Sequence, residues 1–128
     1  MPACTRWPEG AYIKRDIVSV KWEVLYLPEA RAERSKLPAN ERVALDNVVH
    51  KLEAVGPDLG HPHSTSIRQT EGLRELRPRR GSSSWRGIYR RIGETFVIAA
   101  VCPEAQNSAH GFRRGCDAAA ERLAELEE

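Results

Sequence analysis

The chain has 128 residues, of which 41% are hydrophobic and 30% are charged, and its formal net charge is +2. This length suits one domain with a modest core. No apolar run approaches the roughly 20 residues that a membrane-spanning helix needs, and the N-terminal segment lacks the apolar core of a signal peptide. We therefore expect a soluble, cytoplasmic protein without a membrane partner.

The cysteines and histidines indicate neither a disulfide framework nor a metal site. Cys4, Cys102 and Cys116 are odd in number and show no CxxC spacing. We expect Cys102 and Cys116 to pack in the core and Cys4 to be a thiol in the N-terminal tail. His61 and His63 flank a proline, but a zinc site needs further ligands. The sequence thus predicts no metal and no cofactor.

Residues 1–19 carry prolines, a glycine and scattered charges without periodicity, and we expect a flexible arm with no assigned function. Residues 20–128 form the expected domain. Its first strand is indicated by the alternation of Val20, Trp22, Val24 and Tyr26 with Lys21, Glu23 and Leu25. This period of two is typical of a strand with one buried face.

Two helices are predicted next. A short one runs from about 29 to 36 and ends at Leu37-Pro38. The second runs from about Ala39 to Val55, because apolar residues recur there at helical spacing, and Gly56-Pro57 ends it. The residues that carry this spacing are Leu45, Val48, Val49, Leu52 and Val55.

After a long loop over 56–72, three strands are expected at 73–78, 85–92 and 95–102. Gly93-Glu94 suits a two-residue hairpin, so the strands should form an antiparallel meander. The run 96–101 is apolar on both faces, which indicates a central strand. A loop over 103–110 then leads to a closing amphipathic helix. Its apolar face comprises Phe112, Cys116, Ala119, Ala120 and Leu123.

The predicted fold class is therefore α+β, with the order β-α-α-β-β-β-α and a small, mainly antiparallel, twisted sheet packed by helices. The first two helices would cover one face of the sheet. Part of the opposite face would remain for the arginines.

Eight arginines fall between Arg68 and Arg91, opposed in that stretch only by Glu71 and Glu75. Apolar residues interleave with them at strand-like spacing, so part of this charge should stand on the sheet. Arginine's planar fork can hold phosphate bidentately, which points to an RNA or DNA backbone. The alternative is that these arginines are solvated residues that discourage aggregation at the sheet edge. Charge alone leaves both interpretations open.

Four features together resemble a known family: GPxLGxP at Gly56 to Pro62, LRELRP at Leu73 to Pro78, Arg86 at the start of the next strand, and the hydrophobic strand after it. The chain resembles toxins of the RelE/ParE superfamily and is most similar to the phage-derived, HigB-like branch of type II toxin–antitoxin modules. The resemblance covers about Lys21 to Leu126. It implies a RelE-like toxin that enters the ribosomal A site and cleaves translated mRNA.

The same resemblance implies partners and site residues. A cognate antitoxin, expected as a small helix-turn-helix protein, would hold the toxin inactive, and operator DNA would be bound only through it. Arg77 and Arg86 match the family's catalytic arginines and should face the RNA. Glu75, in the same motif as Arg77, is expected to orient an arginine, with general base as an alternative role.

The segment after the last strand, CPEAQNSAHGFRR, lacks the lysine or basic-aromatic cluster of many relatives, which puts catalysis in doubt. His110 lies in the loop predicted there, so we expect it to transfer a proton, or else to be a solvated histidine. Tyr89 alternates with Trp85 on the face opposite Arg86, so it should pack under the sheet. Candidates for RNA binding are Arg79, Arg80, Arg90 and Arg113.

Three functions remain open: an mRNA-cleaving toxin, a ParE-like toxin acting on gyrase, and a catalytically inactive nucleic-acid-binding module or co-repressor. The arginine-rich segment favours RNA, because poisoning gyrase is a protein–protein task with less need for phosphate-binding groups.

Overall fold

The computed structural model describes residues 22–127. The predicted arm at 1–19, with Cys4, lies outside the described residues, and so does Val20. In chain order the elements are β1 (Glu23–Tyr26), α1 (Pro28–Ser35), α2 (Ala39–Val55), the 3-10 helix η1 (Gly56–Asp58), β2 (Ser64–Ser66), β3 (Arg74–Leu76), the 3-10 helix η2 (Pro78–Gly81), β4 (Trp85–Ile92), β5 (Thr95–Pro103) and α3 (Ala109–Leu126).

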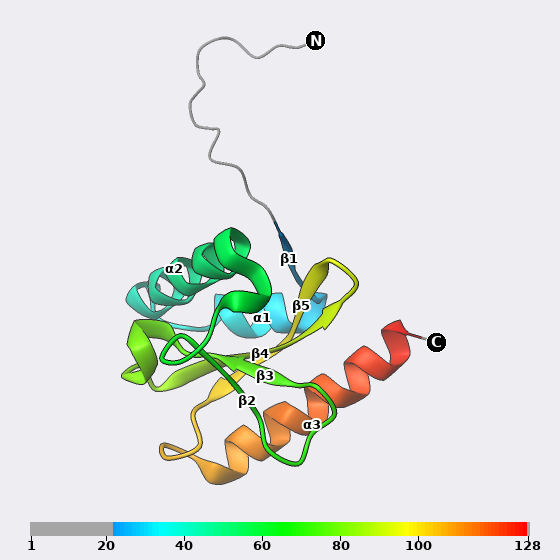
Figure 1. The fold of residues 1–128 in the computed structure, drawn as a ribbon. Helices are drawn as coiled ribbons and strands as arrows, with labels where there is room; N and C mark the ends of the chain where they lie inside the picture. The colour runs from blue at the N-terminus through cyan, green and yellow to red at the C-terminus, as the bar shows by residue number, and fades with distance from the viewer. Residues whose placement is uncertain (1–21, 128) are drawn as a thin grey trace, which may run out of the picture.

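The strands form one five-stranded sheet in the order β1-β5-β4-β3-β2 (Figure 1). β1 pairs with β5 in parallel, and every other pair is antiparallel. The predicted meander of three strands is therefore confirmed, as is the α+β fold class. β5 is buried along its length except at its two ends, as expected of a strand with neighbours on both sides.

The fifth strand, β2, lies inside the segment 56–72, which was expected to be a loop. Its three residues read Ser-Thr-Ser and pair with β3 at the edge of the sheet. A strand this short and polar shows no hydrophobic alternation, so its formation depends on the backbone hydrogen bonds that β3 offers. β3 is itself shorter than predicted, because Pro78 opens η2.

α2 packs on one face of the sheet and forms the first core (Figure 1). Its buried residues Leu45, Val48 and Leu52 share one helical face, as the sequence predicts. They belong to the same core cluster as Ile98 and Tyr89 of the sheet. Alternate residues of β1 are partly buried against this cluster, so its predicted period of two is also confirmed.

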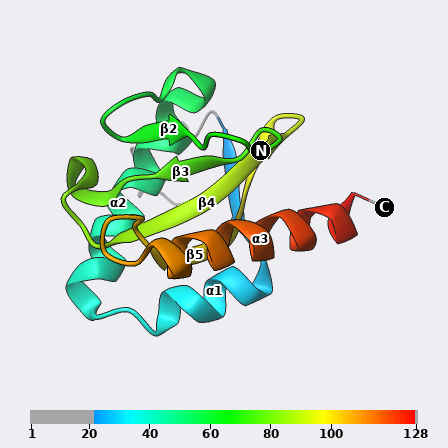
Figure 2. The ribbon, with the colours of Figure 1, turned by 90° about the horizontal axis from the view of Figure 1, so that it is seen from below.

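α3 covers the other face of the sheet, and α1 lies next to α3 (Figure 2), although the buried residue of α1, Ala30, belongs to the first core cluster. Leu123 and Ala119 of α3 are fully buried in a second core cluster with Ile88 and Ala99 of the sheet. The expectation that this face carries the arginines is therefore wrong for most of its length. An amphipathic helix must bury its apolar face, and the alternating apolar residues of β4 and β5 provide the surface for it.

α1 and α3 are joined by an ion pair between Glu33 and Arg122, whose closest atoms are 3.0 Å apart. Both side chains also bind β5 beyond the point where its pairing with β1 ends. Glu33 accepts from the amide of Val101 at 2.9 Å, and Arg122 donates to the carbonyl of Ala99 at 2.7 Å. The pair therefore satisfies backbone groups that no strand reaches.

Candidate functional site

A cavity of about 250 Å³ lies where β3 and β4 meet η2 and the turn that follows β5. Two arginines and two glutamates line it. We call it the arginine cavity. Its lining residues are Glu75, Arg77, Gly81, Arg86, Glu104, Ala105 and Gln106.

Arg86 forms the floor of this cavity, and its side chain is only 3% exposed. Its guanidinium donates to three backbone carbonyls, those of Gly81, Ser83 and Trp85, at 2.7–3.1 Å. Burial lowers the pKa of Arg86 from its usual value, while the nearby carboxylates act in the opposite direction. Arg86 was expected to face the RNA; the structure buries its side chain and uses its guanidinium to hold the η2 turn against β4.

Glu75 on β3 lies between the buried Arg86 and the more exposed Arg77 of the arginine cavity. One carboxylate oxygen accepts from Nε of Arg86 at 3.1 Å, and the other accepts from the hydroxyl of Thr65 at 3.1 Å. Nη1 of Arg77 lies 3.8 Å from that second oxygen. Glu75 thus orients an arginine, as expected from the sequence, and its side chain remains 16% exposed toward the cavity.

Arg77 is the arginine of this cavity that solvent reaches, with 23% of its side chain exposed. Its Nε donates to the carbonyl of Pro62 at 3.2 Å, which fixes one side of the guanidinium. Gly81 lies against it at φ +95°, and a β-carbon there would collide with the guanidinium. The positive φ favours glycine at this position, and a side chain there would displace the Arg77 guanidinium. Because the carbonyl of Pro62 holds only the Nε side, part of the Arg77 guanidinium remains open to a ligand.

The turn after β5 contributes Glu104, whose carboxylate lies 3.6 Å from Nη2 of Arg86. The amide of Glu104 donates to the carbonyl of Ser84 at 2.8 Å, so the backbone holds this residue in place. The two arginines and two glutamates of the cavity sum to zero formal charge. Glu104 and Gln106 were not predicted as site residues, although the absence of a lysine in CPEAQ marked this segment as unusual.

His110 lies in the first turn of α3 rather than in the loop predicted for it. The helix begins earlier because the hydroxyl of Ser108 caps it, accepting from the amide of Gly111 at 3.0 Å. His110 is exposed and lines a different cavity, together with Glu33 and Arg114. The structure does not bring it into the arginine cavity.

Tyr89 packs under the sheet as predicted, with 1% exposure. Its hydroxyl lies 2.6 Å from the hydroxyl of Ser64 and accepts from Nε of Arg74 at 3.3 Å. This network joins β2, β3 and β4 on the α2 side of the sheet. A phenol so engaged is unavailable for proton transfer to a bound ligand.

The four arginines predicted to bind RNA occupy different environments. Arg79 pairs with Glu41 at 2.8 Å, and Arg90 pairs with Glu127 at 2.7 Å. Arg80 and Arg113 are exposed, and neither has an acidic partner within residues 22–127. They are therefore dispersed over the surface rather than aligned on one sheet face.

The two cysteines within the described chain behave as packing residues. Burial raises the pKa of Cys102 to about 12 and that of Cys116 to about 11, so neither thiol is a reactive thiolate near neutral pH. No cluster of three metal-binding side chains occurs among residues 22–127. In the same part of the chain no helix is long and apolar enough to cross a membrane.

Residues 32–102 match the model of a family described as phage-derived protein Gp49-like (DUF891). No curated protein matches the chain. Similar solved structures include a toxin–antitoxin complex, a toxin in the free state and a YoeB dimer. The RelBE2 complex from Mycobacterium tuberculosis is 23% identical, with a TM-score of 0.52, and the match covers 67% of this chain and 94% of that chain.

An Escherichia coli RelE toxin in the free state, with two arginines replaced by alanine, is 18% identical, with a TM-score of 0.54 over 73% of this chain and 97% of that chain. The YoeB dimer from Staphylococcus aureus is 12% identical, with a TM-score of 0.52, and the match covers 66% of this chain and 97% of that chain. At these identities the likeness concerns the fold. The three helices and the mainly antiparallel sheet described above are common to this group.

Proposed function

Because the chain belongs to the phage-derived Gp49-like family and has the fold of the RelE toxins, we propose that it is the toxin of a type II toxin–antitoxin module. We further propose that it inhibits translation by cleaving mRNA on the ribosome. The observation that carries the proposal is the arginine cavity. There an accessible arginine and a partly exposed carboxylate lie side by side.

Metal-free RNA cleavage needs a base for the ribose 2′-hydroxyl and a cation for the phosphate. In this proposal Arg77 binds the scissile phosphate with the part of its guanidinium that Pro62 leaves open. Glu75 takes the proton from the 2′-hydroxyl as its oxygen bonds to phosphorus. The bond to the 5′-oxygen breaks, that oxygen takes a proton from water, and a 2′,3′-cyclic phosphate remains.

Arg86 acts in this scheme from beneath the cavity. It holds Glu75 in position at 3.1 Å and keeps η2 closed around Arg77 through its three carbonyl contacts. Its charge also contributes to the potential at the phosphate, because a buried guanidinium is screened less than an exposed one. Arg86 is thus a positioning residue, while Arg77 contacts the RNA.

The net charge of the cavity is zero, so long-range attraction of RNA must come from arginines outside it. Arg113 is exposed on α3 and forms no ion pair within residues 22–127. It is therefore our first candidate for a phosphate contact. Arg79 and Arg90 would have to exchange their carboxylate partners for phosphate. A cognate antitoxin completes the proposal, as the similar RelBE2 structure is a toxin–antitoxin complex.

A second candidate function follows from Glu104. A carboxylate 3.6 Å from the buried arginine partly neutralises the cation that a charged transition state would use. A chain with this arrangement can bind RNA without cleaving it. This alternative is a RelE-fold module that binds nucleic acid or acts as a co-repressor with its antitoxin.

The test is primer-extension mapping of transcripts after induced expression, with and without translation of the reporter mRNA. We expect cleavage that requires translation and a restoration of growth by the antitoxin. Arg77→Ala and Glu75→Gln should each lower the cleavage rate by about 30- to 1000-fold. His110→Ala, outside the cavity, is the matched control and should cleave normally.

Circular dichroism must show that both cavity variants fold. Intact transcripts during growth arrest, together with inhibition of gyrase supercoiling by the purified protein, would contradict the RNA-cleaving function in favour of a ParE-like one. Intact transcripts without growth arrest would favour the inactive module. A large loss of cleavage in the His110 variant would return that histidine to the mechanism.

A further inference from the structure

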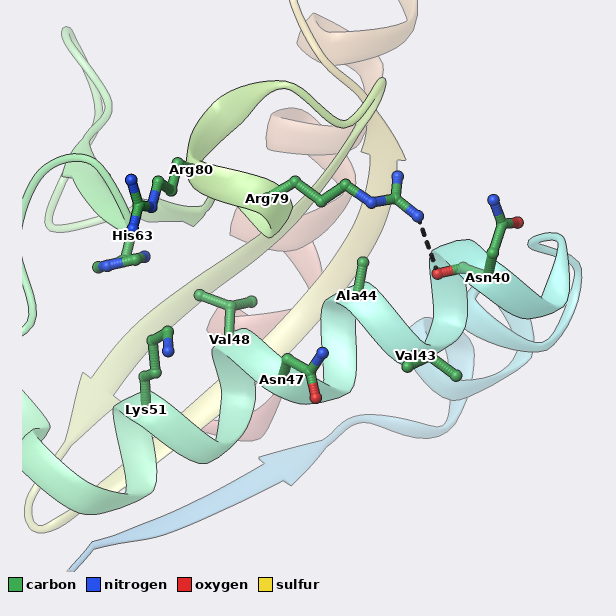
Figure 3. A pocket seen from close by; sticks show the side chains of 9 residues that line it. All are labelled: Asn40, Val43, Ala44, Asn47, Val48, Lys51, His63, Arg79 and Arg80. Atoms are coloured by element: carbon green, nitrogen blue, oxygen red, sulfur yellow. Dashed lines mark hydrogen bonds between the residues drawn. The ribbon is translucent and has the colours of Figure 1, made fainter.

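A second and larger hollow, of about 650 Å³, lies between α2 and the η2 turn (Figure 3). It is separate from the arginine cavity, with which it shares no residue. We call it the α2–η2 groove. Its lining residues are Asn40, Val43, Ala44, Asn47, Val48, Lys51, His63, Arg79 and Arg80.

The floor of the groove is one face of α2. Its residues recur at three- and four-residue intervals from Asn40 to Lys51, which corresponds to about 17 Å of helix. Val43, Ala44 and Val48 make the centre of this face apolar, but Ala44 and Val48 are buried in the core, so Val43 provides the exposed apolar surface. Val43 is 57% exposed, the most exposed of the large hydrophobic residues within residues 22–127. A partner that covered it would remove apolar surface from water.

The rim of the groove is basic, and none of its lining residues is acidic. Lys51 and Arg80 are exposed and have no acidic partner in the described part of the chain. Arg79 is held in place by Glu41 at 2.8 Å and by the carbonyl of Asn40 at 3.2 Å, as Figure 3 shows for the second contact. Burial lowers the pKa of His63, and Lys51 and Arg80 lower it further.

The backbone of η2 is strained where it presents the two arginines. Arg79 has φ 54° and ψ 40°, and Arg80 has φ 58° and ψ 28°, so two successive non-glycine residues are left-handed. L-residues adopt this conformation at a cost, and it persists where surrounding contacts hold it. Here it directs both side chains toward the groove (Figure 3).

We propose that the α2–η2 groove binds an acidic amphipathic segment of a protein partner, about three helical turns long. An apolar side chain of that segment would cover Val43, and its carboxylates would meet Lys51 and Arg80. An RNA backbone fits less well, because phosphodiesters have no apolar groups to place on Val43. The proposal does not depend on RNA cleavage, which concerns the arginine cavity.

The experiment uses three probes with the full chain: two synthetic helical peptides of about 12 residues and a short oligouridylate. The peptides share one leucine stripe and differ in having glutamates or lysines beside it. We expect fluorescence anisotropy to show that the glutamate peptide binds at least about tenfold more tightly than the other two probes.

Matched variants locate the binding. Val43→Asp and Lys51→Glu should each weaken binding of the glutamate peptide by about tenfold. The controls are Val55→Asp, an exposed valine of α2 outside the groove, and Lys36→Glu, an exposed lysine after α1. Both controls should bind as the unaltered chain does. Circular dichroism checks that all four variants fold.

Equal affinity for the two peptides would overturn the proposal, as would an equal loss in the control variants. Tighter binding of oligouridylate that is weakened by Lys51→Glu would assign the groove to RNA instead. A positive result with the glutamate peptide stands even if the chain cleaves no mRNA. A failure here likewise leaves the proposed cleavage in the arginine cavity untouched.

Discussion

Arg77 and Arg86 carry the same side chain and lie in the same cavity, yet their surroundings give them different tasks. Arg86 is 3% exposed and donates to three carbonyls and to Glu75. Arg77 is 23% exposed and has a single hydrogen bond to a carbonyl. At the residue scale, then, the loss of Arg86 should affect folding, whereas the loss of Arg77 should affect ligand binding and chemistry.

Replacement of Arg86 by alanine tests this division. Arg86→Ala should lower the free energy of unfolding by about 3 kcal/mol, because it leaves buried carbonyls and Glu75 without their donor. Arg77→Ala should cost less than about 1 kcal/mol, since its guanidinium is partly solvated. Urea denaturation followed by circular dichroism measures both, with exposed Arg113→Ala as control. Equal losses for Arg77 and Arg86 would contradict the assignment.

At the scale of elements, the η2 turn is the part that positions both hollows. Its left-handed arginines and Gly81 depend on contacts that η2 makes with α2 and β4. Glu41 of α2 is the main anchor on one side, because it accepts from Arg79 at 2.8 Å and from Ser83 at 2.8 Å. These hydrogen bonds from Arg79 and then Ser83 lower the pKa of Glu41 from its usual value.

The lowered pKa predicts a dependence of stability on pH. A carboxyl whose pKa is lower in the folded state stabilises the fold above its unfolded pKa, near 4.3, and this contribution disappears as pH falls through the folded value. The stability difference between the unaltered chain and Glu41→Gln should therefore be largest above about pH 5 and shrink toward about pH 3.

Urea midpoints measured across this pH range provide the test for Glu41, with Glu125→Gln on the exposed side of α3 as control. A difference that stays constant from about pH 3 to about pH 6 would show that the charge of Glu41 does not anchor η2.

For the whole molecule, the sheet separates two cores that share β4 and β5. α2 covers one side and α3 the other, so each core buries one set of alternating residues on the same strands. Trp22 and Trp85 pack only against the α2 side. Because the strands are common to both cores, we expect the chain to unfold as one cooperative unit.

Leu123→Ala tests this cooperativity from the α3 side. The fully buried leucine should cost about 2–5 kcal/mol on truncation, whereas Leu126→Ala, 52% exposed in the intact chain, should stay within about 0.5 kcal/mol. Tryptophan fluorescence in a Trp7→Phe background reports the α2 side through Trp22 and Trp85. The fluorescence and circular dichroism transitions of Leu123→Ala should coincide, and separated midpoints would show that the two cores unfold independently.

Periodicity in the sequence was sufficient to predict α2, β4, β5 and α3 to within a few residues, because each buries an apolar face that recurs at its own spacing. The arginines and Glu75 were also found from the sequence, since their motif is local. The start of α3 before His110 depends on the local Ser108 cap, whereas the burial of Arg86, the pairing of β2 and the α2–η2 groove were decided by tertiary structure. Each of these last three depends on groups distant in sequence, such as Glu104 beside Arg86, the backbone of β3 beside Ser64–Ser66 and the approach of Arg80 to α2. A charge pattern shows how many charged side chains a segment carries. Only the fold determines which of them have partners and which remain exposed to a ligand.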